Sequence, residues 1–120
     1  MGQARTDDWA ERRELNVEDH RLAFSGVEWA AIAPGARHKI FERDGKRVRL
    51  LELSPEFVEV EWCRKGHVGV VLQGVLELDF AGRTERFNRG DGLFILAGET
   101  GKHKARPISE RVTLFLVDDI

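Results

Sequence analysis

Three side chains that can bind a metal ion lie close together in the middle of the chain. Glu61, Cys63 and His67 occur within the run EWCRKGH, with one residue between the first two and three before the last. Alternate side chains of an extended strand point to the same side, so Glu61 and Cys63 are predicted to share a face. Residues 64–66 predict a corner, after which His67 begins an apolar run. The pattern therefore predicts a carboxylate, a thiol and an imidazole converging inside a β-structure.

All three groups bind divalent ions, and the sulfur ligand favours zinc first, then iron, nickel or copper. Another interpretation of the same residues needs no metal. Cys63 is then a small buried apolar residue, Glu61 a solvated strand residue and His67 a hydrogen-bonded core histidine. A further alternative is nucleophilic catalysis by Cys63, with His67 or His103 as the base.

Composition limits the classes of protein to consider. A chain of 120 residues forms one domain that buries about two-thirds of its unfolded surface. With 42% apolar and 33% charged residues, it is an ordinary globular sequence. The net charge of -2 disfavours a nucleic-acid partner, and a single cysteine excludes an internal disulfide. No apolar run reaches membrane-spanning length and the N-terminus lacks the apolar core of a secretion signal, so we predict a cytoplasmic protein without a membrane partner.

The spacing of turn signals predicts the architecture. Residues 1–19 are polar and are predicted to form a flexible N-terminal arm, with a β-domain over residues 20–120. In that domain, glycine-rich turns separate short apolar runs roughly every 8 to 12 residues, a rhythm typical of an antiparallel sandwich or barrel. Asp44-Gly45 predicts a hairpin, and residues 112–117 predict a buried strand. The fold class is therefore all-β, as a single domain.

Two motifs resemble those of the cupin superfamily, whose fold is a double-stranded β-helix, or jelly-roll barrel. In the first cupin motif two histidines, one residue apart, precede a glutamate and then a glycine. Glu61 and Cys63 stand at the histidine positions, His67 at the glutamate position and Gly74 at the glycine. The second motif resembles residues 90–98, and the resemblance covers roughly residues 46 to 118.

The second motif departs from the cupin pattern at two positions. Leu96 replaces its proline, and Gly101 stands where the histidine ligand is expected, with His103 two residues later. A bulge or a longer turn would bring His103 into register, which makes it the preferred fourth ligand. Without it, three protein ligands leave an open position, the arrangement of a catalytic metal.

Side chains that share the inward face of the ligands are candidates for a substrate pocket. They are Phe57, Glu59, Val71 and Gln73, with His38 and Arg49 as further candidates from neighbouring strands. Arg47 and Arg49 lie on one face of their strand, so they could hold a carboxylate or phosphate. Val58, Val60 and Trp62 are predicted to point outward and to need cover. That apolar face and the resemblance together imply a homodimer.

These residues support three hypotheses on function. In the first, a metal acts as a Lewis acid on a small polar metabolite in the barrel, with Glu61 serving as a catalytic base instead of a ligand. In the second, four ligands close around a structural ion and the protein is a non-catalytic binding module. The third is a degenerate cupin that holds no metal and binds an apolar ligand.

Overall fold

The computed structural model describes residues 20–119. Within this range the chain forms nine strands and two short 3-10 helices, which confirms the predicted all-β fold. The elements are η1 (Phe24–Gly26), β1 (Ala30–Ala33), β2 (Ala36–Arg43), β3 (Lys46–Leu53), β4 (His67–Gln73), β5 (Leu76–Asp79), β6 (Thr84–Phe87), β7 (Gly92–Ile95), η2 (Glu99–Gly101), β8 (Lys104–Pro107) and β9 (Val112–Asp119). The predicted N-terminal arm, residues 1–19, lies outside the described residues.

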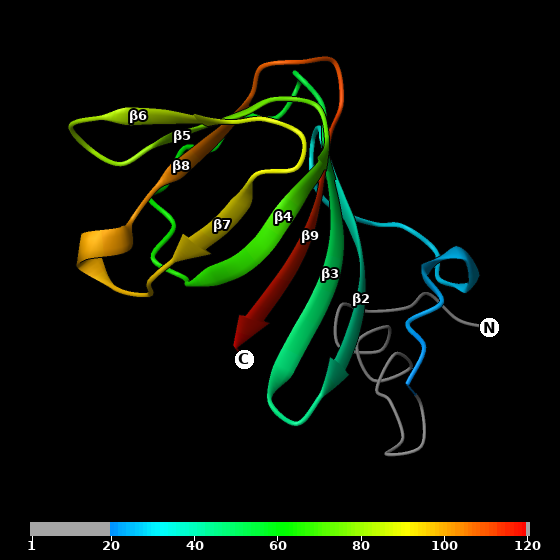
Figure 1. Ribbon diagram of the computed structural model, residues 1–120. Coiled ribbons are helices and arrows are strands. Elements are labelled where there is room, and N and C mark those ends of the chain that lie inside the picture. The colour runs from blue at the N-terminus through cyan, green and yellow to red at the C-terminus, as the bar shows by residue number, and fades with distance from the viewer. Residues whose placement is uncertain (1–19, 120) are drawn as a thin grey trace.

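The strands form two antiparallel sheets that face each other (Figure 1). One has six strands in the order β1-β2-β3-β9-β4-β7, and the other has three in the order β6-β5-β8. The chain crosses repeatedly between the sheets, so strands distant in sequence become neighbours. β9, the last strand, lies between β3 and β4 and joins the two halves of the large sheet.

The predicted hairpin at Asp44-Gly45 is present and sets the register of β2 against β3. Asp44 and Gly45 have φ angles of 53° and 73°. Two successive positive φ angles give a turn whose twist matches that of the flanking strands. From this turn, β2 and β3 pair without interruption from Arg43 opposite Lys46 to Ala36 opposite Leu53.

Strand register sorts the inward-facing side chains by kind. Leu114 of β9 pairs with Leu51 of β3 on one side and with Val71 of β4 on the other. Four residues further along β9, Asp118 pairs with Arg47. The apolar row belongs to a core shared by both sheets: Ala36, Leu53, Val71, Leu76, Leu78, Leu93, Ile95, Val112, Leu114 and Leu116. The polar row lies toward the Asp44-Gly45 hairpin.

The segment before His67 differs from the prediction. Residues 57–62 do not form a strand, and Cys63 makes only an isolated bridge with His103. Without a strand partner, residues 57–62 are not held to strict alternation of faces. Trp62 is half-buried beneath the ammonium groups of Lys102 and Lys104. Val58 and Val60 do point outward, and the homodimer stays a prediction.

Candidate metal site and ligand cavity

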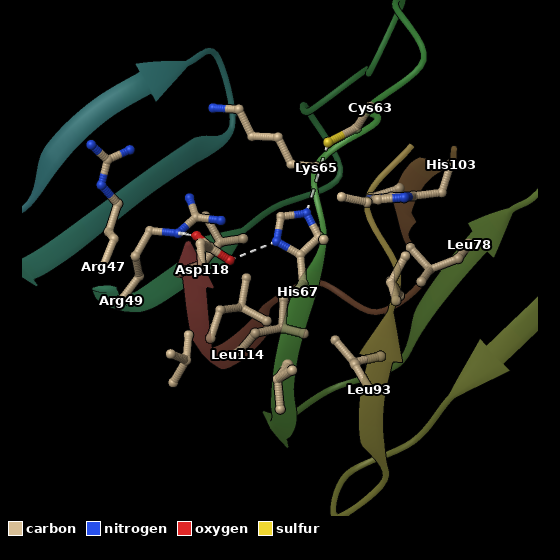
Figure 2. A pocket seen from close by; sticks show the side chains of 18 of the residues that line it. Arg47, Arg49, Cys63, Lys65, His67, Leu78, Leu93, His103, Leu114 and Asp118 are labelled. Atoms are coloured by element: carbon tan, nitrogen blue, oxygen red, sulfur yellow. Dashed lines mark hydrogen bonds and ion pairs between the residues drawn. The ribbon is translucent and has the colours of Figure 1, made fainter. Parts of the chain in front are cut away.

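A cavity of about 950 Å³ lies between the two sheets. Its volume falls in the range of small-molecule sites. Leucines from both sheets line its floor: Leu51, Leu53, Leu76, Leu78, Leu93, Leu114 and Leu116. Figure 2 shows Leu93 and Leu114 at one end of the cavity, and Cys63 and Lys65 at the other. Of the predicted pocket residues, Phe57, Glu59 and Arg49 line the cavity.

Cys63, His67 and His103 meet at the polar end of this cavity. One ligand atom from each lies within 4.8 Å of the others, and all three residues line the cavity. His67 is the first residue of β4, and Cys63 precedes it in the loop. Sequence reasoning thus identified all three members of the cluster.

The backbone brings His103 to Cys63 in spite of its displacement from the cupin motif. Cys63 N–H donates to the His103 carbonyl at 2.8 Å, and His103 N–H donates to the Cys63 carbonyl at 2.9 Å. The 3-10 turn η2 (Glu99–Gly101) is the longer turn that was predicted to bring His103 into register. Gly101 itself has no room for a side chain, because a Cβ there would lie 2.0 Å from the Leu96 carbonyl oxygen. A histidine at position 101 would not fit this turn.

Both imidazoles are held through their Nδ1 atoms. His67 Nδ1 lies 2.7 Å from Asp118 Oδ1, and His103 Nδ1 lies 2.9 Å from the Gly101 carbonyl oxygen. Each Nδ1–H donates to its oxygen, so Nε2 is the nitrogen of each ring that remains for a cation, in place of the proton that it shares with Cys63. Metal-binding histidines are usually fixed in this way, by a carboxylate or a carbonyl on the other ring nitrogen. His67 Nε2 lies 3.8 Å from Cys63 Sγ.

The electrostatics of the cluster favour a thiolate. Interactions with His103 and then His67 lower the pKa of Cys63 from 9.0 to about 5, against the opposing effect of burial. Burial works against a charge on His67, but Asp118 and Cys63 outweigh it and raise the pKa of His67 to about 9. A thiolate is the form of cysteine that binds metals and attacks electrophiles.

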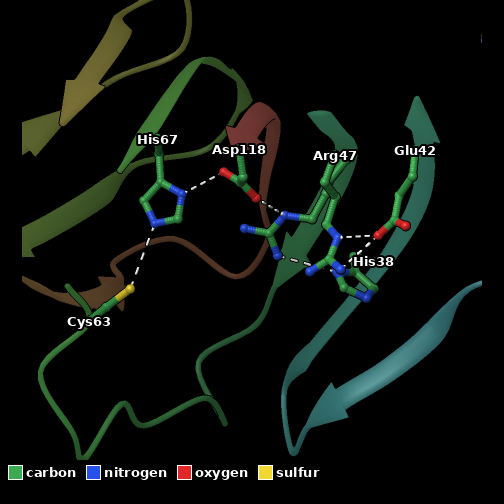
Figure 3. Close-up of polar contacts among 7 residues, drawn as sticks. His38, Glu42, Arg47, Cys63, His67 and Asp118 are labelled. Atoms are coloured by element: carbon green, nitrogen blue, oxygen red, sulfur yellow. Dashed lines mark hydrogen bonds and ion pairs between the residues drawn. The ribbon is translucent and has the colours of Figure 1, made fainter. Parts of the chain in front are cut away.

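A buried network holds Asp118 in place (Figure 3). Arg49 Nε lies 2.7 Å from Asp118 Oδ2, and both side chains are largely buried. Burial opposes the charge of Asp118, but the hydrogen bond from His67 and the charge of Arg49 prevail and lower its pKa. The Arg49 guanidinium also lies 3.2 Å from His38 Nδ1. Burial, Arg49 and Arg47 lower the pKa of His38 to about 4, so its imidazole is neutral and Nδ1 accepts from Arg49.

Glu59 is a second acidic group of the cavity. Its Oε1 accepts a hydrogen bond of 2.7 Å from the backbone N–H of Ala105 in β8. Burial raises the pKa of this carboxyl group, and the Ala105 hydrogen bond opposes the rise. The structure therefore places a carboxyl group on the side of the cavity formed by the small sheet.

Glu61 does not join the cluster. The residue is exposed, does not line the cavity, and contributes no atom to the group of ligands. The expected strand would have turned it to the same side as Cys63, but the chain here is a loop. Its predicted roles as metal ligand and catalytic base therefore receive no support from its position.

Three other predicted pocket residues lie outside the cavity lining. Val71 is buried in the core, and Gln73 is exposed beyond a register irregularity between β4 and β9. His38 is buried on β2, where it contacts Arg49 instead of the cavity.

One residue of the site, Asp118, was not predicted from the sequence, because the predicted last strand stopped at residue 117. The alternation of Val112, Leu114 and Leu116 on the inner face was the available signal.

No protein-family model matches the sequence, and none of the curated proteins matches it. Solved structures do. The polyketide cyclase RemF from Streptomyces resistomycificus superimposes with a TM-score of 0.69 at 22% identity, over 84% of this chain and 79% of RemF. Cupin structures share this fold. An RmlC-like cupin from Shewanella frigidimarina gives a TM-score of 0.67 at 13% identity, over 85% of this chain and 91% of its own.

A further structure, a sugar phosphate isomerase of the cupin superfamily from Silicibacter pomeroyi, matches with a TM-score of 0.68 at 16% identity, over 84% of this chain and 76% of its own. Identities this low establish the cupin barrel and leave the activity open. None of the helices within residues 20–119 is long and apolar enough to span a membrane.

Proposed function

We propose that this cupin binds one divalent metal ion through Cys63, His67 and His103 and uses it to hold a small molecule in the barrel. The observation that carries the proposal is the convergence of three ligand atoms within 4.8 Å at the polar end of the cavity. The fixed Nδ1 atoms of both imidazoles support it, because they aim Nε2 at the shared space. Zinc is the favoured ion for a set of one sulfur and two nitrogen ligands.

Three protein ligands leave a coordination position for a substrate or water. The ion would supply Lewis-acid chemistry there, polarising an oxygen of the bound molecule. His67 is oriented by Asp118, and Asp118 by Arg49, so the chain holds its own ligand rigidly. Glu59, a carboxyl group that lines the cavity, takes in this proposal the proton exchange first assigned to Glu61. Two structures of this fold are named as enzymes, a cyclase and an isomerase, which supports a catalytic role.

Metal titration of the purified, metal-free protein tests this proposal. We expect one zinc ion per chain by elemental analysis, and a large loss of affinity in Cys63→Ser, His67→Ala and His103→Ala. His20→Ala is the matched control, because His20 is an exposed histidine outside the cluster. Unchanged zinc affinity in Cys63→Ser and His67→Ala would reject the site.

Cobalt substitution then separates an open site from a closed one. A Co²⁺-thiolate bond gives a charge-transfer absorption that is absent in Cys63→Ser. If a coordination position is open, added thiocyanate or imidazole will shift the cobalt spectrum. A spectrum that no added ligand changes would favour the non-catalytic binding module, with a structural ion.

A cysteine nucleophile is the second candidate function, and one geometric observation favours it. Asp118, His67 and Cys63 lie in series, with 2.7 Å from Oδ1 to Nδ1 and 3.8 Å from Nε2 to Sγ. This is the order of groups in an activated nucleophile, where the carboxylate orients the base and the base takes the thiol proton. A protein that binds no zinc and yet forms a covalent adduct at Cys63 with an electrophilic ester would favour this function.

A further inference from the structure

The cavity combines an apolar floor with a cationic mouth. Its floor consists of leucine side chains from β3, β5, β7 and β9, with Phe57 and Ala105 beside them. The cationic side chains that line it are Lys46, Arg47, Arg49, Arg64 and Lys65. Against these five stand the acidic groups Glu59, Asp118 and Asp119. The whole chain carries a net charge of -2, so this excess of positive charge is a local property of the cavity.

The cationic side chains of the mouth differ in whether a carboxylate of the chain already forms an ion pair with them. Arg49 is engaged with Asp118, and Lys46 with Asp119. Lys65 is different, because no carboxylate within residues 20–119 pairs with it although it lines the cavity. Lys65 lies two residues after Cys63, on the corner that leads into β4. Figure 2 places Lys65 at the end of the cavity that also holds Arg47 and Arg49.

Arg47 can bind the same group of a ligand as Lys65. Its guanidinium binds Glu42 at 2.7 Å, and Glu42 lies outside the cavity lining. One edge of the guanidinium group is held by that carboxylate, while a planar guanidinium has five N–H donors to distribute. A fixed arginine, together with a lysine that has no carboxylate partner among residues 20–119, forms a receptor for a carboxylate group at one opening.

The floor restricts the rest of the ligand. A molecule rich in hydroxyl groups would bury them against leucine side chains, where each hydroxyl without a partner loses its hydrogen bonds to water. Apolar rings or chains gain free energy in the same space. The expectation of a polar metabolite, drawn from the metal ligands alone, therefore applies to only one end of the molecule.

We infer that the ligand of this cavity is an amphipathic organic acid. Its carboxylate lies at the mouth, toward Lys65 and Arg47, and its apolar ring or chain lies among the leucines of the floor. An oxygen near the carboxylate would then reach the proposed metal site, so the inference rests on the proposed function for orientation only. The attraction of the floor and of the two cations does not require the metal.

Calorimetric titration with three probes tests the inference, on both zinc-loaded and metal-free protein. Naphthoate has a ring and a carboxylate, naphthylmethanol has the ring without the charge, and glucuronate has the charge with a hydroxylated body. We expect naphthoate to bind about tenfold more tightly than naphthylmethanol, from the loss of charge-assisted hydrogen bonds. We expect glucuronate to bind roughly a hundredfold more weakly than naphthoate, because it buries little apolar surface.

Charge-removing variants locate the carboxylate. Lys65→Gln should weaken naphthoate binding roughly fivefold and leave naphthylmethanol binding unchanged. Lys104→Gln is the matched control, since Lys104 stacks on Trp62 and does not line the cavity. Arg47→Gln serves as the second variant at the mouth, with the same expected selectivity for the charged probe.

The outcomes separate this inference from the metal proposal. Preference for naphthoate in protein that binds no zinc would support the amphipathic ligand and reject the metal site. Glucuronate binding as tightly as naphthoate, in zinc-loaded protein, would overturn the inference and leave the metal site standing. Equal losses in Lys65→Gln and Lys104→Gln would also overturn it, because the charge at position 65 would then have no special role.

Discussion

The two ends of the cavity are built from the same strands, but one end is lined by apolar side chains and the other by charged ones. On β9 the inward-facing side chains are Val112, Leu114 and Leu116, followed by Asp118. On β3 the inward face changes in the same direction, from leucines to Arg49 and Arg47. The floor binds the two sheets together by apolar burial, whereas the mouth concentrates charge in a partly solvated space. The strand β9 therefore contributes apolar residues to the core and, a few positions later, a carboxylate to the proposed metal site.

The comparison also explains why charges are tolerated at the mouth. Asp118 is buried, but it has both a guanidinium and an imidazole as partners. A buried carboxylate without partners would be protonated or would destabilise the fold. The polar row is thus a connected network, and removing one member leaves another without its partner.

The largest effect is expected at the floor. Leu114→Ala should lower the free energy of unfolding by about 2–5 kcal/mol, because the Leu114 side chain is buried in the core shared by both sheets and its truncation removes apolar contacts there. Urea denaturation of the metal-free protein measures this loss. Leu72→Ala is the matched control, since Leu72 of β4 is 45% exposed and should cost far less. Equal losses in the two variants would mean that burial of Leu114 does not contribute to the stability of the fold.

At the mouth, Asp118→Asn tests whether the charge of Asp118 supports zinc binding through His67. The variant keeps the size of the side chain but removes the charge that orients His67, so zinc affinity should fall about 10- to 100-fold. Asp119→Asn is the control, because the neighbouring carboxylate is exposed and pairs with Lys46. Competition with a chromophoric chelator measures both affinities. The comparison fails if Asp118→Asn binds zinc as tightly as Asp119→Asn.

The thiol of the metal-free protein should titrate far from its ordinary range. Because the pKa of Cys63 is lowered from 9.0 to about 5, the thiolate predominates above about pH 5 and is lost below it. The rate of alkylation by iodoacetamide should therefore level off above about pH 5 instead of rising toward pH 9.0. Cys63 is the only cysteine, so the reagent reports on this site alone. His67→Gln should move the titration to higher pH; an ordinary thiol profile in the unsubstituted protein would contradict the proposed pairing.

The smallest effect is expected at the outer rim. Arg64 pairs with Glu99 at 2.8 Å, but both side chains are largely solvated. Exposed ion pairs contribute little to stability, so Arg64→Gln should leave the melting temperature and the zinc affinity unchanged within error. A clear drop in either quantity would show that the polar network extends to the rim of the cavity.

Sequence patterns predicted the parts of this molecule that depend on neighbouring residues. The turn rhythm predicted an antiparallel barrel, Asp44-Gly45 predicted the hairpin, and the two motifs predicted the cupin fold. The ligand candidates Cys63 and His67 were available from their spacing, and His103 from the resemblance to the second cupin motif. These features follow from local conformational preference and from period-two alternation, which a single sequence displays.

The tertiary structure decided which of those candidates meet. Asp118 reaches His67 across 51 positions of sequence, and Cys63 meets His103 through an isolated bridge just before β8. Glu61 left the cluster because the loop before His67 has no strand partner to hold its alternation. Pairings between distant segments depend on sheet order and register, and local spacing does not encode either one. The sequence thus determined the chemical groups, and the packing of the two sheets determined the site.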